Sequence, residues 1–209
     1  MVTKTLPAPN PGPTTDRGEA TRRHILDVAG YAFAEHGYRG ISLNDIVRES
    51  GLTKGAFYFH FPSKEALALA VFQDKQEDWI GQTMAALMQC HRAIDQLEAM
   101  LEVGCDILER DVSVRVVGRL CLEMASQEEL QPRLLPHLTT WFEMTAQLIR
   151  RAQEEGDVRP DIDPKVFAET IVSAFMGIEH VSDALSNFED FRRRIDGLRA
   201  LVMAAIAIR

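Results

Sequence analysis

The side chains that are best suited to bind a polyanion lie close together in the sequence, between residues 53 and 64. A hydroxyl, a lysine and a glycine follow one another at Thr53, Lys54 and Gly55, which is suitable for an exposed helix start whose unpaired N–H groups face phosphates. Ring tips at Tyr58 and His60 are polar enough to contact phosphate oxygens. The pattern therefore favours contact with the backbone and groove edges of duplex DNA.

A pair of short helices must position these side chains. Ser42 followed by Asp45 is a capping-box variant that predicts a helix start, and Gly51 permits the left-handed backbone that ends a helix sharply. Only two residues separate Gly51 from a second helix, predicted over about 53–60, so the two helices must cross steeply. Pro62 ends the second helix, and Ser63 caps a long helix over about 63–88. This arrangement is a helix-turn-helix. Ser42, at the start of its first helix, is also a candidate for contact with DNA.

An aromatic run lies within the second helix of the pair. Phe57 and Phe61 are four residues apart and should share the inward face, with Phe59 near its edge and Tyr58 and His60 outward. Lys64, in the first turn of the next helix, would be a phosphate clamp.

The residues before the pair are predicted to form one bracing helix after an unstructured arm. Four prolines and no apolar period predict that residues 1–17 are disordered. A helix is predicted over about 19–36, with Gly37 ending it. Arg22 and Arg23 at its start are further candidates for contact with DNA.

Several segments together resemble the N-terminal domain of TetR-family transcriptional repressors. The resemblance covers residues 20–70 and rests on FAEHGY at 33–38, residues 46–51, TKGAFYFHF at 53–61 and SKEALA at 63–68. Within that family, the aromatic run, a mid-domain tryptophan and the segment 118–120 look similar to the gamma-butyrolactone autoregulator receptors of actinomycetes and their furan and butenolide relatives. The resemblance implies a homodimeric repressor that leaves its operator when a small lipophilic signal binds.

Charge and length support two domains of an all-α protein. Residues 1–64 hold 8 Lys or Arg against 6 Asp or Glu, a net charge of +2, whereas residues 65–209 hold 15 against 25, a net charge of −10. Because screening limits repulsion to about 8 Å at physiological salt, DNA would be bound at the N-terminal end alone. We expect an arm at 1–17, a helix-turn-helix domain at 18–65 and a ligand-binding and dimerisation domain at 66–209.

The second half is predicted to be helical and to pair with another copy. Helices are predicted over 91–110, 113–125, 132–155, 164–187 and 190–208. The last two have apolar residues on more of their surface than one partner can cover, which favours a two-fold four-helix interface in a homodimer. Two copies of the reading pair would then bind a pseudo-palindromic operator.

The ligand-binding residues are predicted from apolar and sparse polar side chains in the second half. The resemblance implies that Trp141 lines the cavity for the signal, and plain core packing is the alternative. Lipophilic cavities combine apolar walls with a few polar groups. The further candidates are Phe72, Gln76, Trp79, Leu120, Cys121, Leu138, Thr145, Phe175 and Glu179.

Other function classes find little support in the sequence. No Gly-x-Ser-x-Gly, phosphate-binding glycine run or His-Glu-x-x-His motif occurs, so we expect no enzyme activity, cofactor or metal. No apolar run could span a membrane and no signal peptide is recognisable, which favours a cytoplasmic protein. Cys90, Cys105 and Cys121 are interpreted as buried thiols, with a redox sensor at Cys121 beside Arg119 as the alternative. Three alternative functions stay open. The protein could be a helical adaptor without DNA binding, a repressor that responds to a drug, or a repressor that responds to no signal.

Overall fold

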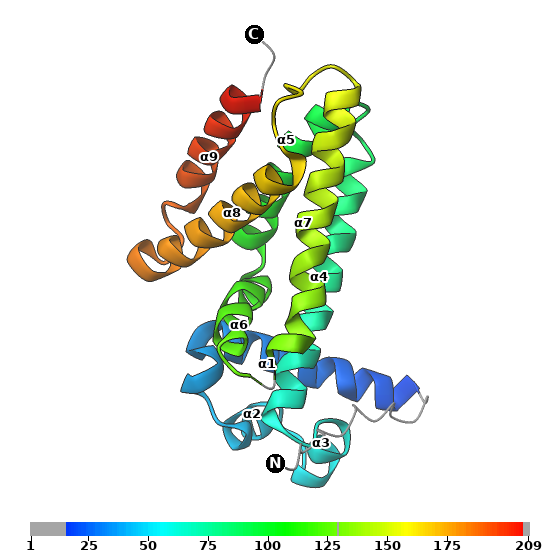
Figure 1. Cartoon of the computed structure of the whole chain (residues 1–209). Coiled ribbons are helices and arrows are strands. Elements are labelled where there is room, and N and C mark those ends of the chain that lie inside the picture. Colours follow the sequence, from blue (N-terminus) through cyan, green and yellow to red (C-terminus); the bar gives the residue numbers. More distant parts are fainter. Residues whose placement is uncertain (1–15, 129, 207–209) are drawn as a thin grey trace. The chain divides into compact units, whose positions relative to one another are not determined.

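The regular elements of the chain are helices, as the sequence predicts (Figure 1). The computed structural model describes residues 16–128 and 130–206, apart from the side chains of residues 137 and 138. The described helices are α1 (Asp16–Gly40), α2 (Leu43–Glu49), α3 (Lys54–His60), α4 (Lys64–Leu87), α5 (Ala93–Arg110), the short 3₁₀ helix η1 (Val112–Arg115), α6 (Val116–Ala125), α7 (Gln131–Glu154), α8 (Pro164–Ser186) and α9 (Phe191–Ile206).

Packing divides the chain into two compact units. Of the described residues, the first unit comprises 16–76 and 113–120, and the second comprises 77–112, 121–128 and 130–206. Helices α4 and α6 each contribute residues to both units. The packing boundary between the two units thus lies within α4, after Gln76.

Local signals determine the helices of the first unit. Gly37 interrupts α1 with a φ of 72°, and Gly51 has a φ of 66°, so both predicted helix ends use the left-handed backbone that glycine tolerates. Ser42 and Asp45 form the expected capping box of α2. Thr53 caps α3, and the Ser63 hydroxyl accepts a hydrogen bond from the Ala66 N–H at the start of α4.

Two expectations about the first unit are wrong. Helix α1 begins at Asp16, so Arg17 lies in a helix and not in a disordered arm, while residues 1–15 lie outside the described residues. Phe57 and Phe61 are buried as predicted, but Phe59 is 51% exposed, more than Tyr58 at 39%. The reason is that α3 is only two turns long and has a single buried side, which Phe57 occupies.

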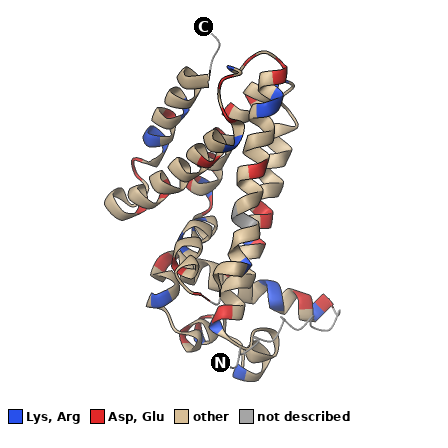
Figure 2. Ribbon diagram, in the orientation of Figure 1, with Lys and Arg blue, Asp and Glu red and all other residues tan. Residues whose placement is uncertain are grey.

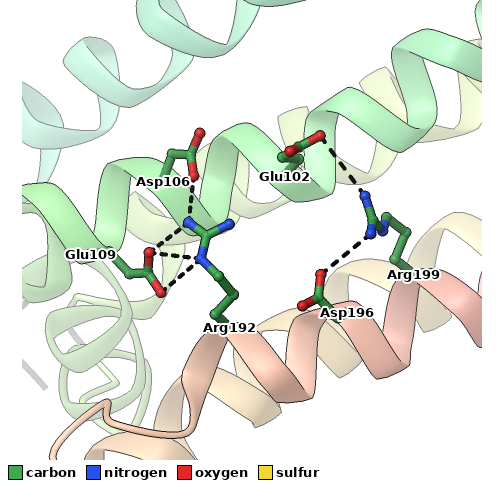
Figure 3. A network of polar contacts seen from close by, with 6 residues as sticks. All are labelled: Glu102, Asp106, Glu109, Arg192, Asp196 and Arg199. Atoms are coloured by element: carbon green, nitrogen blue, oxygen red, sulfur yellow. Dashed lines mark hydrogen bonds and ion pairs between the residues drawn. The ribbon is translucent and has the colours of Figure 1, made fainter.

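The second unit is a helical bundle in which α7 packs on α5 and α8, and α9 packs on α5 and α8. Ion pairs join α9 to α5 (Figure 3). The Arg192 guanidinium binds the carboxylates of Asp106 and Glu109, and Arg199 lies 3.9 Å from Glu102 and 3.4 Å from Asp196. Exposed ion pairs contribute about 0–1 kcal/mol each, so this network specifies the register of α9 more than it stabilises the unit.

None of the described helices combines the length and the apolar composition of a bilayer-spanning segment.

Candidate functional site

The N-terminal end of α3 presents polar groups on an apolar base. The Thr53 hydroxyl accepts a hydrogen bond from the Ala56 N–H at 3.3 Å, which fixes the start of the helix. Lys54, Gly55 and Tyr58 are exposed, and a Cβ added at Gly55 would meet nothing within 4 Å. Packing within the protein therefore does not require glycine at position 55, and the exposed surface can accept the close approach of a second molecule.

Two cations of the first unit contact aromatic rings. The Arg22 guanidinium lies 5.5 Å from the centre of the Phe61 ring, and the Lys64 ammonium lies 4.6 Å from the centre of the Tyr38 ring. Arg23 is exposed on the same helix as Arg22. Figure 2 shows basic residues on α1 and α3. Cation–π contacts with Phe61 and Tyr38 restrain the orientation of the Arg22 and Lys64 side chains.

The remaining predicted DNA contacts have clear local roles. Partial burial of His60, and secondarily the charge of Arg22, lowers the pKa of the His60 imidazole below its usual value. His60 is therefore mostly neutral at pH 7 in the free protein. The Ser42 hydroxyl is exposed but bonded to the Asp45 carboxylate in the capping box, so its first role is to begin α2.

Long-range polar contacts brace the helix that supports the tip. The Arg119 guanidinium donates hydrogen bonds to the carbonyl oxygen of Ala34 and, at 3.3 Å, to that of Glu35, near the end of the regular part of α1. The buried Lys75 ammonium lies 3.3 Å from the Asp27 carboxylate. Both contacts tie α1 to segments distant in the sequence, which makes the base of the tip rigid.

An aromatic cluster joins four helices of the second unit. The Trp79 ring centre lies 5.6 Å from that of Trp141 and 6.0 Å from that of Phe175, and Phe175 lies 5.9 Å from Phe191. These rings come from α4, α7, α8 and α9. Gly104 of α5 makes room for them, because an added Cβ would lie 3.0 Å from the Phe175 ring.

Polar groups are buried in the same unit. The Thr145 hydroxyl, one turn after Trp141, lies 3.6 Å from the Met100 sulfur. The Glu179 carboxyl is buried one turn after Phe175. Burial raises the pKa of the Cys121 thiol to about 11, and the neighbouring charge of Glu179 adds to the increase. Apolar rings with few polar groups are the composition of a small-molecule site.

The structure thus brings together some of the predicted ligand-binding residues and not others. Trp79, Trp141 and Phe175 share one cluster in the second unit. Phe72, Gln76 and Leu120 are buried but belong to the first unit. Leu138 lies in α7, and its side chain is outside the described part of the chain.

The cysteines do not have the properties of redox sensors. Burial raises the pKa of the Cys105 thiol to about 12, so Cys105 and Cys121 stay protonated and are poor nucleophiles. The alternative of a redox sensor at Cys121 depends on the Arg119 guanidinium, which instead donates to carbonyl oxygens of α1. The interpretation as buried thiols is right for these two, and Cys90 is half-buried. Among the described residues, no group of three or more potential metal ligands gathers.

Sequence reasoning missed several residues that shape the two sites. Arg119 and Lys75 act through contacts more than 45 positions away along the chain. Phe191 extends the cluster from α9, and no helical period identifies it as part of that cluster. Gly104 lies inside a regular apolar helix, and an isolated helical glycine of this kind is a usable sign of close packing.

Two family descriptions match most of the chain. Residues 25–71 match bacterial regulatory proteins of the tetR family, and residues 93–198 match the tetracyclin repressor-like C-terminal domain. The A-factor receptor protein of Streptomyces griseus is 30% identical over 194 residues, which are 91% of this chain and 65% of that protein. The chain therefore spans somewhat less than two thirds of this relative. The HTH-type transcriptional repressor DhaR of Mycobacterium sp. (strain GP1) is 25% identical over 75% of this chain and 79% of its own.

Solved structures share the fold. One, described as the molecular basis for control of antibiotic production by bacterial hormones, is 35% identical with a TM-score of 0.79, covering 90% of this chain and 98% of its own. TylP, a TetR regulator from Streptomyces fradiae, is 30% identical with a TM-score of 0.70, covering 92% and 89%. The helix-turn-helix, the helical second unit and these matches agree, and the chain belongs to the TetR family of bacterial regulatory proteins.

Proposed function

We propose that this protein is a ligand-responsive transcriptional repressor of the bacterial cytoplasm. It binds a pseudo-palindromic operator as a homodimer, and a small lipophilic signalling molecule of the gamma-butyrolactone, butenolide or furan type releases it. The observation that carries the DNA-binding part is the exposed tip of α3, where Thr53, Lys54 and Gly55 stand on the buried Phe57.

The tip has the chemistry that duplex DNA requires. Its first turn offers unpaired N–H groups and a cation, and Gly55 leaves room for a phosphate or base edge. Arg22, Arg23 and Lys64 add positive charge around it. The rings that contact Arg22 and Lys64 restrain these two side chains, so less entropy is lost when they meet phosphates.

The exposed sides of α8 and α9 support dimerisation through the last two helices. On each helix, small and apolar residues recur at helical spacing on the exposed side, and Leu185 and Leu201 are 73% and 72% exposed. A Cβ added at Gly177 or Gly197 would meet nothing within 4 Å. The exposed members are Val166, Thr170, Ser173, Gly177, Val181, Ala184 and Leu185 on α8, and Gly197, Ala200, Leu201, Ala204 and Ala205 on α9. Helices with such sides can approach closely, and a second copy of the chain would remove them from water.

The aromatic cluster supports the ligand part of the proposal. Trp79 and Trp141 provide large apolar rings with one N–H donor each, and Thr145 and Glu179 provide polar groups in the same unit. The similarity to a receptor for A-factor and to a hormone-controlled regulator favours a lipophilic signal of that kind.

The test of DNA binding is a mobility-shift titration with the DNA upstream of the protein's own gene. Lys54→Ala should weaken binding, and should reduce the slope of log affinity against log salt by about 2 for the dimer, because one phosphate contact is lost per protomer. Arg150→Ala, which removes one exposed positive charge from α7, is the matched control and should change neither quantity.

Two results would contradict the proposal in different ways. If Lys54→Ala binds with the affinity and salt slope of the unmodified protein, α3 is not the reading helix. If the unmodified protein binds no double-stranded probe at low ionic strength, the repressor function fails and a helical adaptor is the better interpretation. DNA binding that no lactone, butenolide or furan relieves would favour a receptor for another ligand, or for none.

A further inference from the structure

Two threonine hydroxyls in the second unit are buried without a good hydrogen-bond acceptor. Thr83 of α4 and Thr145 of α7 are both 0% exposed. Among the described residues, the Thr83 hydroxyl has no hydrogen-bond partner. The Thr145 hydroxyl lies 3.6 Å from the Met100 sulfur, and a thioether is a weak acceptor. Buried polar groups are nearly always satisfied, so this pair requires an explanation.

Helix geometry places both hydroxyls one turn beyond the tryptophan pair. Trp79 and Trp141 contact each other across α4 and α7, and Figure 1 shows these two helices running in the same direction. Thr83 and Thr145 each follow the tryptophan of their own helix by four residues, so they lie on the same side of it, one turn further along.

The neighbouring helix confirms this layer. Helix α5 runs in the opposite direction to α4 and α7 (Figure 1). Its Gly104 approaches the Trp79 ring, at 3.6 Å from an added Cβ, and Met100, one turn earlier on α5, accepts from Thr145. One layer of the bundle therefore holds the tryptophan rings. The next layer, one turn towards the C-terminal ends of α4 and α7, holds Thr83, Met100 and Thr145.

Each of these hydroxyls has a proton to donate and no strong acceptor to receive it. A carbonyl oxygen has two lone pairs and can accept from two donors at once. A neutral ligand with one carbonyl group and an apolar remainder would satisfy both hydroxyls and place its apolar part against the tryptophans. A ligand without an acceptor would leave both hydroxyls unsatisfied.

We propose that the hydroxyls of Thr83 and Thr145 bind the carbonyl oxygen of a neutral lipophilic ligand whose apolar part contacts Trp79 and Trp141. This inference rests on the proposed ligand response and makes it specific: it names the group that is recognised and adds Thr83 to the site. The carbonyl of a lactone or ester fits this description.

Intrinsic fluorescence tests the proposal directly, because the chain contains two tryptophans and both lie in the cluster. The probes are γ-decalactone and hexyltetrahydrofuran, which differ by the ring carbonyl alone. The unmodified protein should bind γ-decalactone more tightly. Thr83→Val should bind γ-decalactone about tenfold more weakly, since one hydrogen bond to the carbonyl is lost. Its affinity for hexyltetrahydrofuran should be unchanged. Thr83→Ser, which keeps the hydroxyl, should retain the affinity.

Thermal unfolding without any probe separates a ligand contact from a structural role. Thr83→Val keeps the branched shape and removes an unsatisfied hydroxyl, so its midpoint should equal or exceed that of the unmodified protein. Thr139→Val, at an exposed position of α7, is the control and should leave probe binding unchanged.

Several results would overturn the proposal. The unmodified protein could bind the two probes with equal affinity, or neither probe could change its fluorescence. Thr83→Val could lose the same affinity for both probes, or its midpoint of thermal unfolding could be clearly lowered. A mobility-shift assay on the same samples keeps the two proposals apart. Intact DNA binding with any of these results removes the carbonyl site alone, whereas absent DNA binding removes the repressor function.

Discussion

The contact between Gly104 and the Phe175 ring allows a sharp test of the aromatic cluster. A Cβ at position 104 would lie 3.0 Å from Cζ and 3.3 Å from Cε2 of Phe175, closer than ordinary van der Waals contact. The ring would have to move by a few tenths of an ångström. It has little freedom to do so, because Trp79 and Phe191 lie on other sides of it at 6.0 and 5.9 Å between ring centres.

Two opposing effects set the magnitude for Gly104→Ala. Alanine is better than glycine inside a helix by about 1 kcal/mol, which stabilises the variant. Overpacking a position that is already in close contact costs about 1–3 kcal/mol. The net result is a loss of about 0–2 kcal/mol in the free energy of unfolding. Gly81→Ala on α4 is the matched control, because its added Cβ meets nothing within 4 Å and it keeps the full gain.

The decisive quantity is the difference between the two alanine variants. Gly104→Ala should unfold about 2–12 °C below Gly81→Ala in a thermal melt, since about 1–3 kcal/mol separates them and each kcal/mol shifts a chain of this size by about 2–4 °C. Its tryptophan emission should also change, because Trp79 contacts the displaced ring. If Gly104→Ala gains as much stability as Gly81→Ala, Phe175 does not press on α5 and the described cluster is wrong.

Two further predictions concern DNA binding and assembly. A phosphate beside His60 would raise the lowered pKa of its imidazole, so DNA binding should take up a proton and tighten as the pH falls from about 7.5 to about 6. A mobility-shift series should show this trend in the unmodified protein and a weaker one in His60→Ala; equal trends would exclude His60 from the interface. Gly177→Leu should convert the dimer to a folded monomer in sedimentation velocity, whereas Gly81→Leu should stay dimeric, because both positions are open within one chain and only Gly177 lies on the proposed interface. A dimeric Gly177→Leu would contradict pairing through α8.

Sequence reasoning succeeded where structure depends on neighbouring residues. The capping box at Ser42 and the positive φ of Gly51 are effects within one turn, so their residue types alone predict where α2 begins and ends. The helices of the second half were also located to within a few residues, because their apolar periods are long.

It failed where residues far apart in the chain decide the outcome. Nothing near Arg119 indicates that it binds the carbonyl groups of α1, and nothing near Phe59 shows that its side of α3 is left exposed. The packing boundary inside α4 has the same origin. It depends on which helices contact each half of α4, and the sequence of α4 alone does not contain that information.

The proposed signal must do more than occupy the aromatic cluster, because release requires unequal binding to two states of the protein. Changing the balance of two states from about 1:99 to about 99:1 requires about 5.5 kcal/mol of differential affinity. Two hydrogen bonds to Thr83 and Thr145 contribute about 1–3 kcal/mol together. The remaining difference of about 2.5–4.5 kcal/mol corresponds to about three to six methylene groups at about 0.8 kcal/mol each. A carbonyl group alone is therefore too weak an effector, and a ligand with an alkyl chain against Trp79 and Trp141 is strong enough. Helix α4 begins at Lys64 in the first unit and carries Trp79 in the second, so it is a continuous element through which that energy can act.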